Sequence, residues 1–181
     1  MRRLWWRHLL SVLLAPAMMT VFIPVTIGIL ADVGVPDLGT PRGLVLALVG
    51  GALIAFGLFM LAWTVVLFDR IGDGTLAIGS PVKLVVTGPY RHVRNPMMTA
   101  VFCIQLGTAV VWSSPWLFAW FVFFFTAVLI AIRTVEEPHL RRRFGGDYDQ
   151  YRRHVPRWIP RVRAWEPLSG GQTNSGKPVS T

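Results

Sequence analysis

The 181-residue chain is just over half hydrophobic (53%) and only 15% charged, with a formal net charge of +9. A water-soluble domain carries roughly 25% charged residues, so the composition excludes an ordinary soluble enzyme and predicts an integral membrane protein of one domain. The single cysteine excludes an internal disulfide, and the four scattered histidines predict no metal site. In such a protein, the basic excess favours contact with an anionic membrane surface over contact with nucleic acid.

The first apolar run extends from Leu9 to about Ala31, after a short basic segment that holds three arginines. Ala15-Pro16-Ala17 resembles the cleavage site of a secretory signal peptide, which leaves that alternative open. We favour an uncleaved membrane span, because a run of about 23 residues is longer than a usual signal core and can cross a bilayer. Pro16 and Pro24 are expected to kink this helix.

A second apolar run, Gly43–Phe68, follows a short polar loop over residues 32–42. About 26 residues without a charge can span a bilayer with some tilt. Gly50, Gly51 and Gly57 predict a close contact with another helix, because glycine lets two helix backbones approach each other.

The third apolar block, Met97–Ile132, would be roughly 54 Å long as one helix, which is too long for a single span. Trp112-Ser113-Ser114-Pro115 interrupts it, so we predict a helical hairpin with a first arm of about 16 residues. The first arm is expected to begin with Asn95 as N-cap and Pro96 as the first helical residue. The second arm is expected to continue into residues 133–144.

The tail that follows, Arg133–Arg163, is basic and aromatic. Its apolar residues recur at spacings of four, three and four: Phe144, Tyr148, Tyr151 and Val155. This pattern predicts one face of an amphipathic helix that lies on the membrane and ends at Pro156 and Pro160. From Trp165 onward the Gly-, Ser- and Thr-rich chain is expected to be disordered, so we predict one domain over 1–165 and a disordered tail over 166–181.

Basic residues indicate how the spans are oriented. The N-terminal segment, the connection Asp69–Asn95 and the tail are basic, whereas the loop 32–42 holds one arginine and the turn 112–115 holds none. With both termini in the cytoplasm, the positive-inside rule places every basic segment on one side. The predicted fold is all-α and integral to a membrane. We expect this membrane to be a bacterial inner membrane. The fold has about four transmembrane helices, a C-terminal helical hairpin and a basic cytoplasmic amphipathic tail.

Two segments carry unusual polar residues close to the predicted membrane surface. Residues 88–100 read G-P-Y-R-H-V-R-N-P-M-M-T-A, where arginines stand beside a helix N-terminus that can hold an anion. The residues alone favour a plain basic loop that obeys the positive-inside rule. Glu136 and Glu137 also have a purely structural interpretation. Glu137 can pair with Arg141, and Glu136 with Arg133, on the helix surface.

Four pieces of sequence then occur in order: G-x-G-T at 72–75, G-P-Y-R-x-x-R-N-P-M at 88–97, E-E-P at 136–138 and F-G-x-x-Y-x-x-Y at 144–151. Together they resemble the isoprenylcysteine carboxyl methyltransferase family. The N-P-M and E-E-P pieces are also similar to phosphatidylethanolamine N-methyltransferases. The motif-bearing part covers residues 69–160.

The resemblance implies a pocket for S-adenosylmethionine at the cytoplasmic ends of the last helices. It carries catalytic roles over to His92, Arg94 and Asn95. It carries cofactor-binding roles over to Gly72, Gly74, Tyr90, Arg91, Arg94, Pro96, Glu136, Glu137, Tyr148 and Tyr151. These residue types suit the cofactor. Arginine can bind its carboxylate, glutamate can bind its ammonium or ribose hydroxyls, and the ring face of a tyrosine attracts its sulfonium.

The implied function is methyl transfer from this cofactor to a lipid or membrane-partitioned acceptor, a carboxylate or an amine, at the cytoplasmic face. His92 can take a proton from an amine acceptor, although a neutral histidine bonded within the loop explains it equally well. Met98 and Ala100 stand where many family members have tyrosine and glycine. They leave two alternatives open: a protein that keeps the fold without catalysis, and a protein-S-isoprenylcysteine O-methyltransferase proper.

Overall fold

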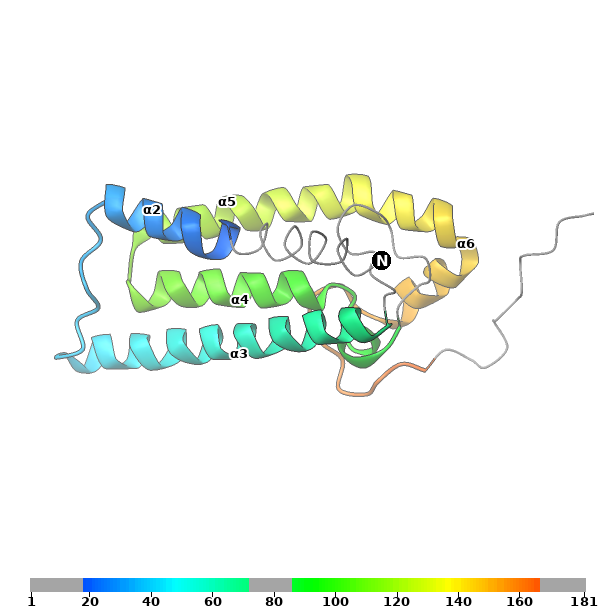
Figure 1. Ribbon diagram of the computed structural model, residues 1–181, viewed down its shortest axis with the longest axis horizontal. Helices are drawn as coiled ribbons and strands as arrows, with labels where there is room; N and C mark the ends of the chain where they lie inside the picture. Colours follow the sequence, from blue (N-terminus) through cyan, green and yellow to red (C-terminus); the bar gives the residue numbers. More distant parts are fainter. Residues whose placement is uncertain (1–17, 72–85, 167–181) are drawn as a thin grey trace, which may run out of the picture.

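The computed structural model describes residues 18–71 and 86–166, apart from the side chains of 68–71. Within these ranges every regular element is a helix, and there is no β-strand (Figure 1). The all-α prediction is therefore confirmed for the described part. The elements are the π-helical turn η1 (Met18–Phe22), α2 (Ile23–Leu30), α3 (Pro41–Ile71), the 3-10 turn η2 (Gly88–Arg91), α4 (Pro96–Val111), α5 (Pro115–Ala131), the π-helical turn η3 (Ile132–Glu136) and α6 (Glu137–His154).

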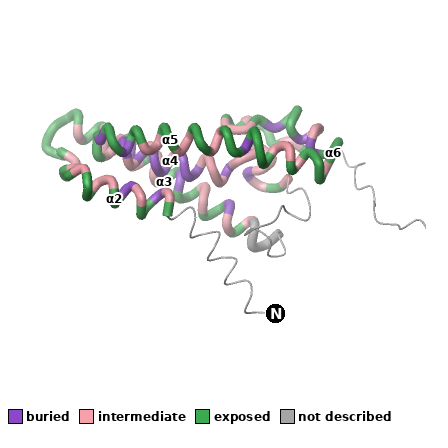
Figure 2. Tube along the Cα trace, turned by 90° about the horizontal axis from the view of Figure 1, so that it is seen from above, coloured by how far each residue is buried: buried purple, intermediate pink, exposed green. Residues whose placement is uncertain are grey.

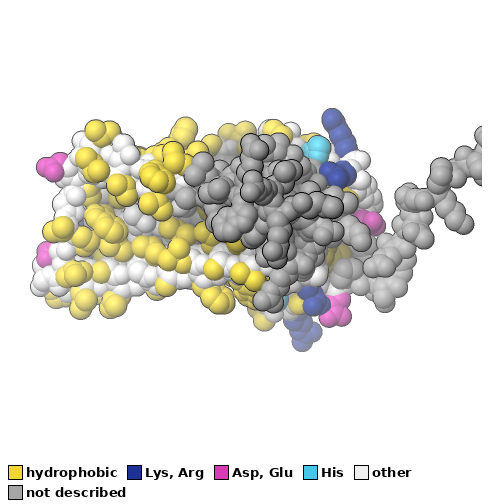
Figure 3. Space-filling model, in the orientation of Figure 1, with side chains coloured by type: hydrophobic (Ala, Val, Ile, Leu, Met, Phe, Trp, Pro, Cys, Tyr) yellow, Lys and Arg dark blue, Asp and Glu magenta, His cyan; other side chains and the backbone are white. Residues whose placement is uncertain are grey.

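The helices form an elongated bundle in which α3, α4 and α5 run side by side (Figure 1). The α2–α3 loop and the α4–α5 turn lie at one end, and α6 lies at the other (Figure 1). Charged side chains show at the two ends of the face in Figure 3, and apolar side chains cover the length between them. This separation is the pattern that a bilayer around the middle of the bundle would require.

Two helices of the described part, Pro41–Leu67 and Pro115–His154, are long and apolar enough to cross a membrane, judged by length and composition. Their outward side chains are large and apolar, including Leu48, Phe59 and Phe123, each more than 60% exposed. The other two apolar helices, Met18–Leu30 and Pro96–Val111, are shorter. The number of spans stays a prediction.

Helix α4 holds more buried residues than any other helix of the described part and lies between α3 and α5 (Figure 2). A Cβ added to Gly50 or to Gly57 of α3 would lie 2.6–2.7 Å from the carbonyl oxygen of Gly107 or of Ala100 on α4. The predicted close contact is confirmed for Gly50 and Gly57. It is wrong for Gly51, which has open space beside it because it points to another side of the helix.

The predicted helical hairpin is confirmed. Helix α4 begins at Pro96 after Asn95 and is 16 residues long, although the Asn95 side chain forms no capping hydrogen bond. The turn places Ser113 at φ 48°, and the Ser114 hydroxyl accepts a hydrogen bond from the Leu117 N–H (3.4 Å), which caps α5.

The second arm continues without a break from α5 through η3 into α6, as expected. Gly145 (φ 53°, ψ −126°) kinks α6, and the chain beyond it folds back against its own site. Tyr148, Tyr151 and Val155 do share one face, but they are at most 3% exposed and pack with Val86, Leu140, Phe144 and Trp165. The expectation that this face lies on the membrane is therefore wrong, because the chain itself covers it.

Trp165 corrects the expected start of disorder. Its ring lies 5.8 Å from that of Tyr151 and stacks on His154 at 5.5 Å, so the ordered chain extends at least to this residue. Residues 167–181 lie outside the described residues, as do the possible cleavage site at 15–17 and Pro16. Pro24 lies in the first turn of α2, and the π-helical turn η1 precedes this helix directly.

Candidate functional site

The motif loop, residues 88–95, begins with a 3-10 turn and leads into α4. Gly88 has φ +55°, and a Cβ there would lie 2.9 Å from the Leu67 side chain, so both backbone angle and space require glycine. The loop passes beside α3 at the same end of the bundle as α6 (Figure 1).

A segment that follows α6, residues 156–166, binds along the motif loop, and we call it the C-terminal strap. The Arg94 N–H donates to the Pro156 carbonyl (2.9 Å), the Arg161 N–H to the His92 carbonyl (3.0 Å) and the Trp165 N–H to the Arg91 carbonyl (3.0 Å). These three backbone bonds join segments more than 60 residues apart and fix the shape of the motif loop.

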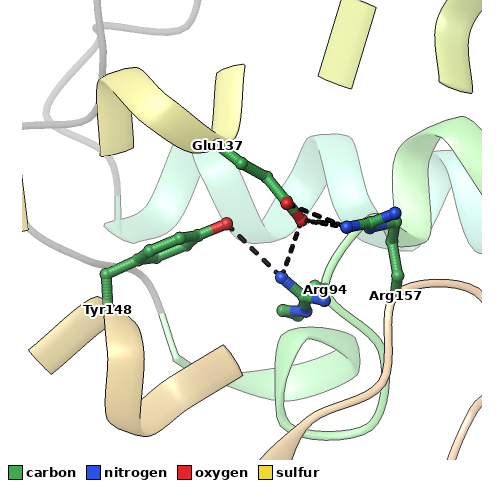
Figure 4. Close-up of polar contacts among 4 residues, drawn as sticks. All are labelled: Arg94, Glu137, Tyr148 and Arg157. Atoms are coloured by element: carbon green, nitrogen blue, oxygen red, sulfur yellow. Dashed lines mark hydrogen bonds and ion pairs between the residues drawn. The ribbon is translucent and has the colours of Figure 1, made fainter. Parts of the chain in front are cut away.

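Glu137, the first residue of α6, is held between two arginines (Figure 4). Arg94 of the motif loop donates from Nη1 to Oε1 (2.9 Å), and Arg157 of the strap donates from Nη2 to both carboxylate oxygens (2.8 Å each) and from Nε to Oε1 (3.0 Å). The side chains of Arg94, Arg157 and Glu137 are 10%, 18% and 11% exposed. Because charges this far from water require partners, the cluster ties the motif loop, α6 and the strap together.

Arg94 is not fully used by these contacts. Its Nη1 also lies 3.4 Å from the Tyr148 hydroxyl oxygen, but its buried Nε has no hydrogen-bond partner among the described residues. A buried guanidinium N–H without an acceptor is costly, and an acceptor from a bound anion would relieve that cost.

Tyr148 and Tyr151 lie near this arginine, Tyr151 also contacts Tyr90, and all three tyrosines have a raised pKa. Burial is the main cause for each, and nearby charge adds to it: Glu136 at Tyr90 and Glu137 at Tyr148, while Arg94 opposes the shift at Tyr148 and Tyr151. The Tyr151 hydroxyl donates to the Tyr90 carbonyl (2.7 Å), and the rings of Tyr148 and Tyr151 lie 6.4 Å apart. The neutral aromatic rings can offer their faces to a cation.

Glu136 differs from its neighbour, since it forms no ion pair with any described residue. Partial burial raises the pKa of its carboxyl, and the charge of Glu137 raises it further. The alternative of surface pairs with Arg133 and Arg141 is therefore wrong. Glu137 turns inward to Arg94 and Arg157, and Arg141 donates instead to Asp149 (3.3 Å).

The remaining predicted residues of the motif loop bind the strap. His92 Nδ1 lies 2.8 Å from the Arg161 carbonyl oxygen, which only accepts, so Nδ1 carries a proton and Nε2 is the free ring nitrogen. Arg91 donates from Nε to the Trp165 carbonyl (2.9 Å) and from Nη2 to Glu166. Pro96 is buried at the start of α4.

The structure thus brings Tyr90, Arg94, Glu137, Tyr148 and Tyr151 together, and it places Arg91 and His92 against the strap. Gly72 and Gly74 lie outside the described residues. Sequence reasoning missed Arg157, one arginine among many in the tail. A signal was present in P-R-W-I-P at 156–160, where prolines on both sides fix the backbone around Arg157 and Trp158.

Comparison with known proteins agrees with the order of the motifs. A sequence model of the phospholipid methyltransferase family matches residues 45–147, which is more than half of the chain. The chain belongs to the phospholipid methyltransferase family. The predicted relationship to this group of methyltransferases is thereby confirmed.

The names of three curated relatives specify methylation at three different atoms, nitrogen, oxygen and sulfur. The chain is 38% identical over 74 residues to a phosphatidylethanolamine N-methyltransferase of Schizosaccharomyces pombe (41% of this chain, 8% of that protein). It is 37% identical over 82 residues to a protein-S-isoprenylcysteine O-methyltransferase of the same organism (44% and 34%). It is 29% identical over 124 residues to a methanethiol S-methyltransferase of Crocosphaera subtropica (61% and 48%).

The chain thus spans less than half the length of each of these relatives. No solved structure matches it significantly.

Proposed function

We propose that the protein transfers a methyl group from S-adenosylmethionine to a lipid or membrane-partitioned acceptor at the cytoplasmic membrane face. The observation that carries the proposal is the contact between Arg94 and Glu137. It joins the two family segments, 43 residues apart in sequence, at one end of the bundle beside an unsatisfied guanidinium N–H.

The residues present fit the cofactor. The Nε of Arg94, which has no partner in the described part of the chain, suits its carboxylate. The carboxylate of Glu136, which pairs with no described residue, suits its ammonium or ribose hydroxyls. The faces of Tyr90, Tyr148 and Tyr151 suit its sulfonium by about 0.5–2 kcal/mol per contact. When bound, the cofactor supplies an electrophilic methyl group on sulfur, and the protein's task is to align the acceptor in line with it.

The names of the relatives support a shared donor site and a variable acceptor. They specify methylation at nitrogen, oxygen and sulfur, so we assign the common residues to the methyl donor. An amine acceptor must lose a proton, and His92 Nε2 can receive it because Nδ1 already donates to the Arg161 carbonyl. A carboxylate or thiolate acceptor needs no such base.

The large apolar side chains exposed on α3 and α5 support entry of the acceptor from the bilayer. We place the bundle across the membrane with about four spans and both termini in the cytoplasm, since the charges of the described part gather at the ends of the bundle (Figure 3). This orientation puts Arg94 and Glu137 at the cytoplasmic surface, where a soluble cofactor can reach them.

Ala100, one of the two departures from the family pattern, argues little against catalysis. It is fully buried, and its carbonyl oxygen closely approaches Gly57 of α3, so the contact between α3 and α4 forms with alanine at this position. Met98 is half-buried in the first turns of α4.

Methyl transfer tests the proposal directly. Purified protein in lipid nanodiscs is incubated with S-adenosylmethionine carrying a radiolabelled methyl group, and separate samples contain phosphatidylethanolamine or an S-prenylated cysteine. We expect label in the organic extract of at least one sample, and loss of it with Arg94→Ala. Label with prenylated cysteine alone would favour the O-methyltransferase proper. No transfer by folded wild type to either acceptor or to total membrane lipid would favour the non-catalytic alternative.

A further inference from the structure

Arg157 and Arg94 share Glu137 unequally. Arg157 contacts both carboxylate oxygens through Nη2 (2.8 Å each) and one of them again through Nε (3.0 Å). Arg94 contacts a single oxygen through Nη1 (2.9 Å). Arg157 of the strap thus binds the Glu137 carboxylate in a bidentate manner, whereas Arg94 of the motif loop contacts it through one oxygen (Figure 4).

The way in which Glu137 is shared decides which N–H groups of Arg94 remain available to a ligand. If Glu137 were paired with Arg94 alone, a bidentate geometry would be favoured, which uses two N–H groups of one guanidinium edge. Arg157 occupies Oε2, and the buried Nε of Arg94 is left without a partner among residues 18–71 and 86–166. The charges agree with this view, since two arginines and one glutamate leave the cluster with one net positive charge, favourable for an anion.

The strap holds Arg157 at a fixed distance from Arg94. The carbonyl of Pro156, directly before Arg157, accepts the N–H of Arg94 itself (2.9 Å). On the other side, the ring of Trp158 lies 5.3 Å from that of Phe102 and 6.3 Å from that of Phe125, which anchors the strap on α4 and α5. Arg157 is therefore placed between a backbone bond and an aromatic anchor.

We propose that Arg157 is a positioning residue of the methyl-donor site: it occupies Glu137, so that Arg94 keeps N–H groups free for the carboxylate of the donor. The inference rests on the proposed function. It assigns to the strap a part of the site that the family motifs do not contain, because the matched family region ends at residue 147.

Two ligands separate this role from a general structural one. S-adenosylhomocysteine carries the carboxylate, and 5′-methylthioadenosine keeps the nucleoside and the sulfur but lacks the carboxylate. Calorimetry on the full chain in detergent compares their affinities for wild type, Arg157→Gln and the control Arg163→Gln, an exposed arginine of the same strap. We expect Arg157→Gln to weaken S-adenosylhomocysteine at least tenfold and methylthioadenosine less than twofold, with no change in the control.

The double variant Glu137→Gln with Arg157→Gln tests the mechanism. It removes both partners, restores one net positive charge to the cluster and frees Arg94, so it should recover most of the lost S-adenosylhomocysteine affinity. Arg157→Lys retains the charge but not the bidentate geometry, so it should weaken S-adenosylhomocysteine binding less than Arg157→Gln does. If Arg157→Gln does not fold, the comparison of Arg157→Lys with wild type replaces it.

The outcomes distinguish the inference from the function beneath it. Wild type that binds neither ligand overturns the proposed function and the inference together. Wild type that binds S-adenosylhomocysteine, with unchanged affinity in the Arg157 variants, overturns the inference alone. The inference alone is also overturned if Arg157→Gln weakens the binding of both ligands equally. The same holds if the double variant binds S-adenosylhomocysteine no more tightly than Arg157→Gln, since a purely structural role would give these results.

Discussion

Gly50 of α3 and Gly107 of α4 lie backbone to backbone, and a Cβ on either one would come within 2.6 Å of the carbonyl oxygen of the other. Seven residues further along α3, Gly57 repeats this approach to Ala100. The second contact lies four residues from Pro96, where α4 leaves the motif loop, so helix packing sets the position of the site.

Alanine at Gly50 should therefore destabilise the protein. The added methyl group would meet backbone atoms of α4, and overpacking of this kind costs about 1–3 kcal/mol. Gly51→Ala is the matched control, because nothing lies within 4 Å of its Cβ position and alanine is a better helix former by about 1 kcal/mol. Thermal unfolding in detergent should show a lower midpoint for Gly50→Ala and an equal or higher one for Gly51→Ala. Equal midpoints for the two variants would contradict the close approach.

Gly145→Ala should also destabilise, for a different reason. Space is open around Gly145, but its φ of 53° with ψ of −126° is strained for any residue with a Cβ, at a cost of about 1–3 kcal/mol. Gly146→Ala is the neighbouring control, with open space and no positive φ. Urea unfolding monitored by tryptophan fluorescence should separate the two variants. If Gly145→Ala were as stable as Gly146→Ala, the kink in α6 would not be required.

Local signals in the sequence predict the helices well. Proline at 96 and 115, after Asn95 and Ser114, marks two helix starts, and an apolar block too long for one span requires the turn between them. These features depend on residues close together in sequence. Gly51 shows the limit, because the pattern identifies small residues but not which of them faces the other helix.

The site is predicted less completely, because its contacts are distant in sequence. The family resemblance supplies Arg94 and Glu137, but the residues alone favour a surface pair of Glu137 with Arg141. The strap escapes prediction, since it has no periodicity and its bonds to Arg91, His92 and Arg94 are mostly to backbone atoms. The spacing of Tyr148 and Tyr151 predicts an apolar face correctly, but not that the chain itself covers that face.

The three tyrosines of the chain, Tyr90, Tyr148 and Tyr151, should not ionise at their ordinary pKa of 10.0. Burial raises the pKa of each, so the folded state retains the protons that the unfolded chain releases. Below pH 10 the tyrosines keep their protons in both states and the folded protein has its full stability. Above pH 10 the unfolded chain loses these protons more readily, so stability falls as the pH rises through the raised values.

Absorbance at 295 nm between pH 9 and 12 measures this directly. Native protein should show little tyrosinate at pH 10.5, whereas denatured protein at the same pH should show most of its tyrosines ionised. Tyr151→Phe, which removes the bond to the Tyr90 carbonyl, should cost about 1 kcal/mol of unfolding free energy. Ionisation near pH 10 with unchanged circular dichroism would contradict the buried positions.

The most direct measurement of the central claim is calorimetric binding of S-adenosylhomocysteine to wild type, Arg94→Ala and the exposed control Arg133→Ala. Removal of Arg94 leaves Glu137 paired with Arg157, so the variant should fold. We predict binding by wild type and by the control, and at least tenfold weaker binding by Arg94→Ala, a loss of about 1.4 kcal/mol. No binding by folded wild type, or equal binding by Arg94→Ala, would contradict a methyl-donor site at the junction of the motif loop and α6.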